Sequence, residues 1–261
     1  PEQRARLWHW RLGHPSYATT HYMNRRAKIH DLGKFVCLNE DCVTCDKSKF
    51  KRAPFKADIE DLSGRKKVGP MQRIYCDGFG GQKSFGCPSY HGAVGGFVFV
   101  DTCTGYLDVR LYSHKDQFPR LLEQFLLECR AQDWIVRELV MDTDAVQISR
   151  SSVEPIVAEY DVVLKLASAG APQEDCLGEK AVQTVKQGIR ALMNGAPHLK
   201  KNRWGAAAKY YCRISRVLSP VGDMHKVSAH EVLFGKPPNL KRMFSKVFGA
   251  PLQYKPLTAP A

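Results

Sequence analysis

Two histidines and two cysteines near the N-terminus have the spacing of a metal-ligand set. His9 and His14 form a His-x4-His pair, and Cys42 and Cys45 form a Cys-x2-Cys pair that follows after 27 intervening residues. Two imidazoles and two thiolates make the closed tetrahedral set that zinc favours, with ligand distances of roughly 2.0–2.3 Å. We therefore expect a structural Zn²⁺ ion bound by these four residues.

Other thiols and imidazoles leave the composition of this set open. Cys37 is a third thiol nearby that could replace one ligand, and His21 and His30 are further imidazoles. A group of histidines and cysteines without metal is the plain alternative. Because so short a unit buries little apolar surface, we expect metal binding to supply much of its folding free energy.

Three carboxylates further along the chain could form a second metal site. Asp77 lies in an expected strand, Asp142 directly follows another, and Glu179 precedes a periodic segment. Three carboxylates repel one another unless cations relieve the repulsion. Two Mg²⁺ or Mn²⁺ ions about 3.5–4 Å apart can activate an attacking oxygen and stabilise the leaving oxygen of a phosphodiester. Asp144 competes with Asp142, because residues two apart on a strand share a face, but Asp142 comes directly after the apolar run 139–141.

The elements that would position these acids follow an α/β order. Strands are predicted at 73–79, 92–101 and 106–112, as an antiparallel meander with a Gly-rich loop at 80–91 and a turn at 102–105. Helices are predicted at 116–129, 153–160 and 203–218, and strands at 135–141 and 162–166. This order predicts a mixed five-stranded sheet with flanking helices. If its first and fourth strands are neighbours, Asp77 and Asp142 can meet.

A helix that opens at Glu179 would bring the third acid opposite the two aspartates. A polar loop is expected to end at Gly178, and apolar residues then recur at three- and four-residue spacing, as in an amphipathic helix. Glu179, Gln183 and Lys186 form a stripe beside the apolar face and could serve a metal and a phosphate. An ordinary solvated helix face is the alternative. The apolar positions are Val182, Val185, Ile189 and Leu192.

The net charge of +13 is unevenly distributed along the chain. Residues 1–67 carry a net +7, residues 68–179 a net −7, and residues 180–261 a net +13. An acidic centre between basic flanks suits a site that holds cations while the flanks hold a polyanion, most often nucleic acid. Charge that serves only solubility, or a basic linker at 47–55, is the alternative. The predicted nucleic-acid contacts are Lys47, Lys49, Lys51, Arg52, Lys186, Lys200, Lys201, Arg203, Lys209 and Arg213.

Neither a membrane nor an oxidising compartment is indicated. No run of eighteen apolar residues occurs, and the N-terminal residues lack the apolar region of a signal peptide, so we expect no membrane partner. Nine cysteines, an odd number, argue against a disulfide framework and favour a reducing, intracellular compartment. A chain that starts with Pro1 instead of Met is expected to be a piece processed from a longer product.

The composition divides the chain into four expected parts. Residues 1–55 form a small helical zinc-binding domain, and residues 56–71, which are polar and punctuated by Gly and Pro, form a linker. Residues 72–220 form the α/β core, and residues 221–261 form a basic C-terminal extension. The length of 261 residues suits one medium domain with a small one attached.

Five short motifs follow one another along almost the whole chain. They are residues 7–15 (Leu-Trp-His-Trp-Arg-Leu-Gly-His-Pro) with Cys42 and Cys45, residues 74–78 (Ile-Tyr-Cys-Asp-Gly), residues 99–106, Pro172-Gln173 with Gly178-Glu179-Lys180, and residues 228–238. In order and spacing they resemble the integrase region of Ty/copia-type retrotransposon polyproteins. Among the matched family patterns are the His-His-Cys-Cys zinc domain, the Val-Asp-Asp-x-Ser-Arg-Tyr turn and the closing Gly-x-Lys-Pro motif.

The resemblance implies an RNase-H-like fold and a D,D-E site of Asp77, Asp142 and Glu179. Such a polynucleotidyl transferase would process DNA 3′ ends and join them to a target, in the nucleus and as a homo-oligomer. Residues 141–147 (Met-Asp-Thr-Asp-Ala-Val-Gln) depart from the family's Ser-Asp-Asn-Gly-Gly-Glu-Phe, and residues 174–176 (Glu-Asp-Cys) depart from its Gln-Asn-Gly. The alternatives are an inactive, domesticated integrase that scaffolds a ribonucleoprotein, and an RNase-H-type nuclease without strand transfer.

Overall fold

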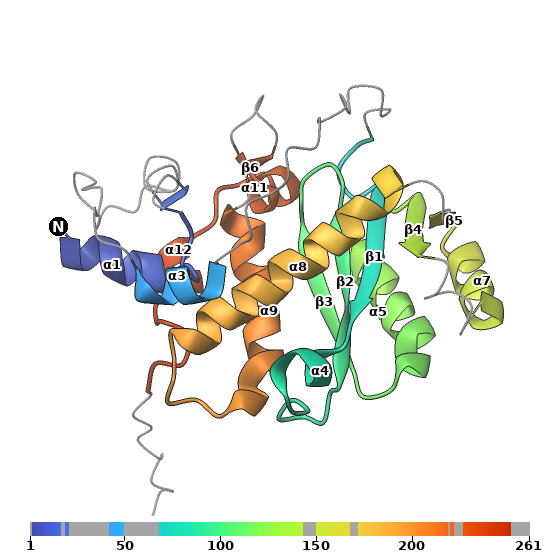
Figure 1. Cartoon of the computed structure of the whole chain (residues 1–261). Coiled ribbons are helices and arrows are strands. Elements are labelled where there is room, and N and C mark those ends of the chain that lie inside the picture. The colour runs from blue at the N-terminus through green and yellow to red at the C-terminus, as the bar shows by residue number, and fades with distance from the viewer. Residues whose placement is uncertain are drawn as a thin grey trace, which may run out of the picture.

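A five-stranded sheet with helices on both faces forms the centre of the computed structural model (Figure 1). The structure describes residues 2–16, 19–20, 42–49, 68–142, 150–167, 172–218, 220–221 and 227–251. The strands are β1 (Arg73–Phe79), β2 (Gly95–Asp101), β3 (Leu107–Tyr112), β4 (Glu138–Asp142) and β5 (Val163–Ala167). Their order is β3-β2-β1-β4-β5; β1, β2 and β3 are antiparallel neighbours, whereas β4 runs parallel to both β1 and β5. The predicted mixed five-stranded α/β sheet is therefore confirmed, with its first and fourth strands adjacent.

Each face of the sheet has its own apolar core. One core lies beneath α1 (Glu2–Arg11), α8 (Pro172–Asn194) and α9 (Trp204–Leu218), and the other lies beneath α5 (Phe118–Ala131) and α7 (Arg150–Glu159). Burial on both faces explains why the strands read as nearly continuous apolar runs. The remaining short elements are α3 (Val43–Lys49), α4 (Gly81–Phe85), η3 (Lys115–Gln117), η4 (Lys201–Arg203), β6 (Pro220–Val221), β7 (Val227–Ser228), α11 (Ala229–Phe234) and α12 (Leu240–Met243).

The N-terminal helix shares a core with the α/β sheet. Ala5, Trp8 and Leu12 are almost fully buried, in the same cluster as Val185, Ile189 and the inner side of α9. In Figure 1, α1 and α3 lie at the end of α8 that is far from β4. Among the described helices, none has the length and apolar character needed to cross a lipid bilayer.

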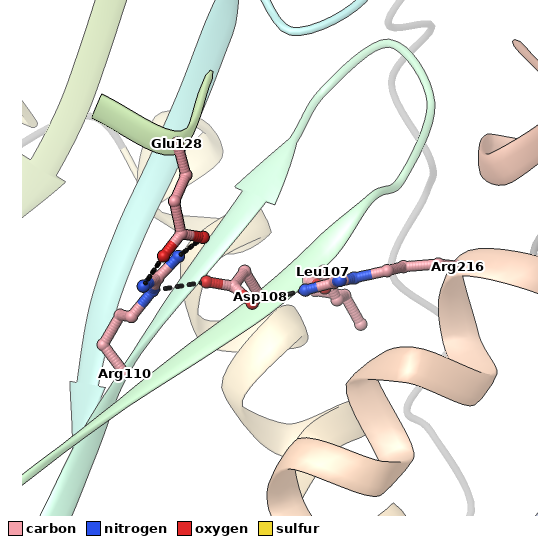
Figure 2. Close-up of polar contacts among 5 residues, drawn as sticks. All are labelled: Leu107, Asp108, Arg110, Glu128 and Arg216. Atoms are coloured by element: carbon pink, nitrogen blue, oxygen red, sulfur yellow. Dashed lines mark hydrogen bonds and ion pairs between the residues drawn. The ribbon is translucent and has the colours of Figure 1, made fainter. Parts of the chain in front are cut away.

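An ion-pair network ties the edge strand β3 to helices on both faces (Figure 2). Arg110 donates to both carboxylate oxygens of Glu128 on α5, at 2.8 and 2.6 Å, and its Nε donates to Asp108 at 2.6 Å. Arg216 on α9 donates to Asp108 and, through Nε, to the Leu107 carbonyl at 2.8 Å. The hydrogen bonds from Arg110 hold the pKa of Glu128 below its usual range. Bidentate arginine–carboxylate pairs of this kind fix orientation as well as contributing energy.

Several predicted boundaries are wrong, and three of the differences have a clear local reason. The helix carrying Glu179 begins at Pro172, seven residues before the predicted start. Proline at the first position and acidic residues in the first turn favour a helix start, although the same polar run also suits a loop. The Gly-rich stretch expected to be a loop contains α4, which ends at Gly86 with φ 79°. Strand β4 starts at Glu138 instead of residue 135, because its pairing with β1 begins at Arg73.

Candidate functional site

The two predicted pairs of metal-ligating side chains converge at the N-terminal end of the molecule. His9 Nε2 lies 3.2 Å from His14 Nδ1 and 3.3 Å from Cys45 Sγ. His14 Nδ1 lies 3.4 Å from Cys42 Sγ and 3.7 Å from Cys45 Sγ. All four ligand atoms lie within 4.8 Å of one another, and both histidines are buried. Among the described side chains, this is the one group of three or more His, Cys, Asp or Glu residues that could hold a metal ion.

The spacing of these atoms matches the edges of a zinc tetrahedron. Ligand distances of about 2.0–2.1 Å to nitrogen and about 2.3 Å to sulfur give tetrahedral edges of about 3.3–3.8 Å. Four of the six distances among these atoms span 3.2–3.7 Å, and all six are within 4.8 Å. Soft thiolates combined with imidazoles select zinc over magnesium or calcium. The cluster thus has the donors and the geometry for one structural Zn²⁺ ion.

The end of α1 aims the two imidazoles at one point. The helix ends at Arg11, after which Gly13 and His14 both have positive φ, 67° and 62°. The His14 amide donates to the His9 carbonyl at 2.8 Å, which closes the helix as a left-handed turn. This reversal of the backbone turns the ring of His14 back towards that of His9. The two histidines of a His-x4-His pair can thus face one metal ion although the helix ends between them.

Helix α3 and the C-terminal end of α8 complete the cluster. Cys42 precedes α3 and Cys45 lies in its first turn, so both sulfur atoms lie at one end of this short helix. Asn194 Nδ2 at the end of α8 donates to Ser48 Oγ at 2.9 Å. A Cβ atom on Gly195 would lie 2.8 Å from His14 Nε2, so only glycine lets the helix end approach this ring so closely. The candidate zinc cluster is therefore docked directly on α8.

A cavity of about 350 Å³ adjoins the cluster. Its lining includes His9, His14 and Cys42 together with Trp10, whose side chain is 44% exposed. Val247 and Phe248 from the C-terminal segment also line it, and the remaining lining residues are Arg6, Val43, Thr44, Leu192 and Gly195. The C-terminal segment thus reaches back across the chain to the N-terminal unit.

No known family model matches the chain. Its relationship to other proteins therefore depends on the motifs and the geometry described here.

Two of the predicted catalytic aspartates occupy neighbouring strands. Asp77 is the fifth residue of β1 and Asp142 is the last residue of β4. Cys76 pairs with Met141, so Asp77 and Asp142 take the next position along the two parallel strands. Neighbouring strands are about 4.8 Å apart at such positions. The described residues include the backbone of Asp142 but exclude its side chain, and Asp144 lies outside them altogether.

Helix α8 crosses β1 at Asp77. A Cβ atom on Gly178 would lie 3.2 Å from Asp77 Cβ, so the helix and the strand are in close contact there. Glu179, the next residue along the helix, is exposed, as is Gln183, while Lys186 is half-buried with its Nζ 5.9 Å from the centroid of the Phe79 ring. The predicted apolar face of Val182, Val185, Ile189 and Leu192 is buried, as expected.

The Asp77 carboxylate has a defined local environment. One of its oxygens, Oδ1, accepts a hydrogen bond from the Gly78 amide at 2.6 Å. The neighbouring Cys76 is directed into the opposite core, where burial first, and the Asp77 charge second, raise the pKa of its thiol well above the ordinary value. A thiol that stays protonated is a poor nucleophile. The chemistry available at this point of β1 is therefore that of the carboxylate.

The predicted nucleic-acid contacts occupy several surfaces. Lys200, Lys201 and Lys209 are exposed, Arg203 and Lys186 are half-buried, and Arg213 is exposed with its Cζ 5.7 Å from the Phe244 ring centroid. Lys47 is exposed on α3, whereas the side chain of Lys49 is outside the described part. Lys51 and Arg52 also lie outside the described residues, as do Cys37, His21 and His30.

Two glycines, Gly178 and Gly195, shape the two candidate sites, and the sequence did not predict their packing roles. Each lets α8 approach another element more closely than a side chain would allow. Gly178 lies inside α8, where glycine lowers helix propensity by about 1 kcal/mol relative to alanine, so its presence there is a signal of close packing, whereas Gly195 directly follows the last residue of the helix. Nothing in the sequence identifies which residue it packs against.

Proposed function

We propose that the chain is an integrase-like polynucleotidyl transferase that processes and joins DNA 3′ ends. Its catalytic residues would be Asp77, Asp142 and Glu179. The zinc cluster would be structural, and the basic segments would bind the DNA phosphates. The motif resemblance suggests the reaction, and the arrangement of β1, β4 and α8 supports it.

One observation carries the proposal: the close contact of α8 with β1 at Asp77. Because Gly178 packs on Asp77, the adjacent Glu179 belongs to a part of the helix that lies over the ends of β1 and β4. Asp142 ends the neighbouring parallel strand one position beyond a paired residue. Three acids distant in sequence therefore have backbone positions around one region of the sheet. The strand order and directions also support the RNase-H-like fold implied by the motifs.

The donor chemistry at these positions fits Mg²⁺ or Mn²⁺. Carboxylate oxygens are the ligands that these hard cations prefer, and no thiol or imidazole is contributed by the three residues. When bound, two such ions supply an activated attacking oxygen and charge stabilisation of the leaving oxygen. Asp77, Asp142 and Glu179 would hold the ions, while Lys186, on the same stripe of α8 as Glu179, would bind a phosphate of the DNA near the acids.

The test is single-turnover cleavage and joining of a labelled DNA duplex end in Mg²⁺ or Mn²⁺. Asp77→Asn, Asp142→Asn and Glu179→Gln should each lower the rate by well over the roughly 10–100-fold seen when a metal's outer-shell partner is lost. DNA affinity should change little, because the phosphate contacts remain. Glu123→Gln, an exposed acid of α5 on the opposite face of the sheet, is the matched control and should retain full activity.

The departures from the family pattern around Asp142 and Glu179 favour a second candidate, a nucleic-acid-binding scaffold without catalysis. Wild type would then bind DNA or RNA with a steep dependence on salt but show no metal-dependent chemistry. Asp144→Ala separates the rival assignments of the second acid: activity lost in this variant and kept in Asp142→Asn would move the site by two residues.

A further inference from the structure

Tyr90 presents an aromatic ring that carries a cation over one face and is largely exposed to solvent. The guanidinium carbon of Arg203 lies 3.9 Å from the centroid of the ring, which is stacking distance. The side chain of Tyr90 is nevertheless 59% exposed. The neighbouring His91 ring lies 5.1 Å away and nearly perpendicular, at 78°, so it is not stacked flat on Tyr90. A tyrosine held in this way is a ready surface for a second planar group.

The ring is positioned by a well-fixed junction between two distant segments. The Tyr90 amide donates to the Asn202 carbonyl at 2.8 Å, and the Trp204 indole donates to the Cys87 carbonyl at 2.9 Å. Gly81 packs against Trp204 so tightly that a Cβ there would lie 2.3 Å from the indole. Figure 1 shows the β1–β2 connection beside the start of α9. The platform is thus held in place before any ligand arrives, which lowers the entropic cost of binding.

The two chain segments that carry Tyr90 and Arg203 contain basic residues and no acidic ones. Residues 78–100, which carry Tyr90, contain no Asp or Glu, and neither do residues 180–222, which carry Arg203. Lys200 and Lys201 are exposed two to three residues before Arg203, and His91 is exposed beside the ring. A polyanion that reaches Tyr90 therefore meets cations without competing carboxylates from either segment.

We propose that Tyr90 is a stacking platform for an unpaired base of single-stranded nucleic acid, with Lys200 and Lys201 binding the adjacent phosphates. This rests on the nucleic-acid binding in the proposed function and adds a subsite for unpaired strand. Every base offers a planar π face, so such stacking tolerates any sequence. An acidic peptide fits less well, because the face of an aromatic ring is negative and repels a carboxylate. In duplex DNA the bases are already stacked, and only an unpaired base can use the ring.

The chain contains a matched control for this geometry. Arg130 lies 4.0 Å from the ring centroid of Tyr160, almost the same stack as Arg203 on Tyr90. That pair, however, has Asp161 next to it in sequence and Asp133 in the wall of the same pocket. If stacking alone sufficed, both tyrosines would bind nucleic acid. If the cationic surroundings are also required, only Tyr90 will.

The experiment measures fluorescence anisotropy of labelled oligothymidylate of about 12 nucleotides, within the usual range of such sites, and of a duplex of equal length. The full chain is compared with Tyr90→Ala, Tyr90→Phe and Tyr160→Ala over a range of salt concentrations. We expect Tyr90→Ala to weaken single-strand binding roughly 5- to 150-fold, the range for one base–aromatic stack. Tyr90→Phe and Tyr160→Ala should match wild type, and duplex binding should be the same for all four proteins.

The salt series separates stacking from charge. Tyr90→Ala should keep the wild-type slope of log affinity against log salt, because no phosphate contact is lost. Lys200→Ala should lower that slope by about 0.7, the value for one phosphate of a single strand. Equal single-strand affinity of wild type and Tyr90→Ala would overturn the platform, and so would an equal effect of Tyr90→Ala on binding of polyglutamate. If wild type binds neither oligonucleotide, both the platform and the nucleic-acid part of the proposed function fail. If wild type binds both and Tyr90→Ala changes nothing, the platform alone fails.

Discussion

Removal of zinc should release α3 while α1 stays in place. The sequence suggested that the whole N-terminal unit depends on the metal, but the structure divides it. Trp8 and Leu12 of the α1 segment are 2% and 0% exposed, within the core beneath α8 and α9. Burying side chains of this size contributes about 1.5–3 kcal/mol each, or about 3–6 kcal/mol together. That contribution does not involve the metal.

Helix α3 has far less to hold it. Of its side chains that the structure describes, Ser48 alone is buried, and Val43 is 63% exposed. Ordering the backbone of its seven residues costs about 7–14 kcal/mol at about 1–2 kcal/mol per residue. The Asn194–Ser48 hydrogen bond returns only about 0.5–1.5 kcal/mol. Structural zinc sites in small peptides supply about 10–16 kcal/mol, which is enough to offset the ordering cost that this hydrogen bond leaves.

The assay is hydrogen exchange followed by mass spectrometry, before and after a high-affinity chelator. Amides of residues 43–49 should lose protection on chelation, whereas those of residues 5–12 should keep most of theirs, and added Zn²⁺ should restore both patterns. Cys42→Ser with Cys45→Ser should reproduce the chelated state without chelator. Loss of protection over both segments together would refute the division of energies, and no change in either would refute the metal site.

Three further predictions concern the core and its ion pairs. Gly188→Ala should lower the free energy of unfolding, measured in urea, by about 1 kcal/mol or more. The new Cβ atom would lie 2.1 Å from the Tyr211 ring, and this overpacking outweighs the gain in helix propensity. An unchanged urea midpoint would contradict this packing. The hydrogen bond from Arg73 holds the pKa of Glu138 below its usual range. The carboxylate therefore stabilises the folded protein at pH values above its pKa in the unfolded chain. This stabilisation is lost as the pH falls through the lower pKa of the folded protein. Glu138→Gln should therefore cost about 0.2–1 kcal/mol at neutral pH and less in acid, as followed by urea melts at several pH values; a constant difference would refute the linkage. The buried Cys76 thiol, with its raised pKa, should resist alkylation in the folded protein and react in urea; rapid labelling of the folded chain would show that the core opens there.

The sheet and the candidate zinc cluster could be predicted because each leaves a local signal. Strand β1 begins and ends at the predicted residues, since Arg73 and Phe79 bound a short apolar run. The His-x4-His and Cys-x2-Cys spacings likewise identify their ligands without knowledge of the fold. Such spacings do not show where the cluster packs on the rest of the protein, because the contact of His14 with Gly195 joins residues 181 positions apart.

The start of α8 was mispredicted because two local preferences compete in the same residues. Polar residues with Pro at the front are common both in loops and in the first turns of helices. The buried positions that decide between them begin only at Gly178 among the described side chains, so the periodic pattern gave a start that was too late. Burial of a glycine is invisible to a hydrophobicity pattern, although here it brings the helix against Asp77.

Helix α8 connects the two candidate sites through its two close glycine contacts. Gly178 touches Asp77 and Gly195 touches His14, and the separation of 17 positions between these contacts corresponds to about 25 Å of helix. A continuous helix is stiff over this length, and its apolar face is buried throughout by α1, α9 and the sheet. Under the proposed function, the zinc cluster therefore has a role beyond holding α3, because it anchors one end of the helix that carries Glu179. Loosening the His14 end leaves the Asp77 end held by Val182 and Val185, which are buried within two turns of Gly178. The acids should consequently keep their relative positions when zinc is lost, while the basic α3 loses its fixed position relative to them.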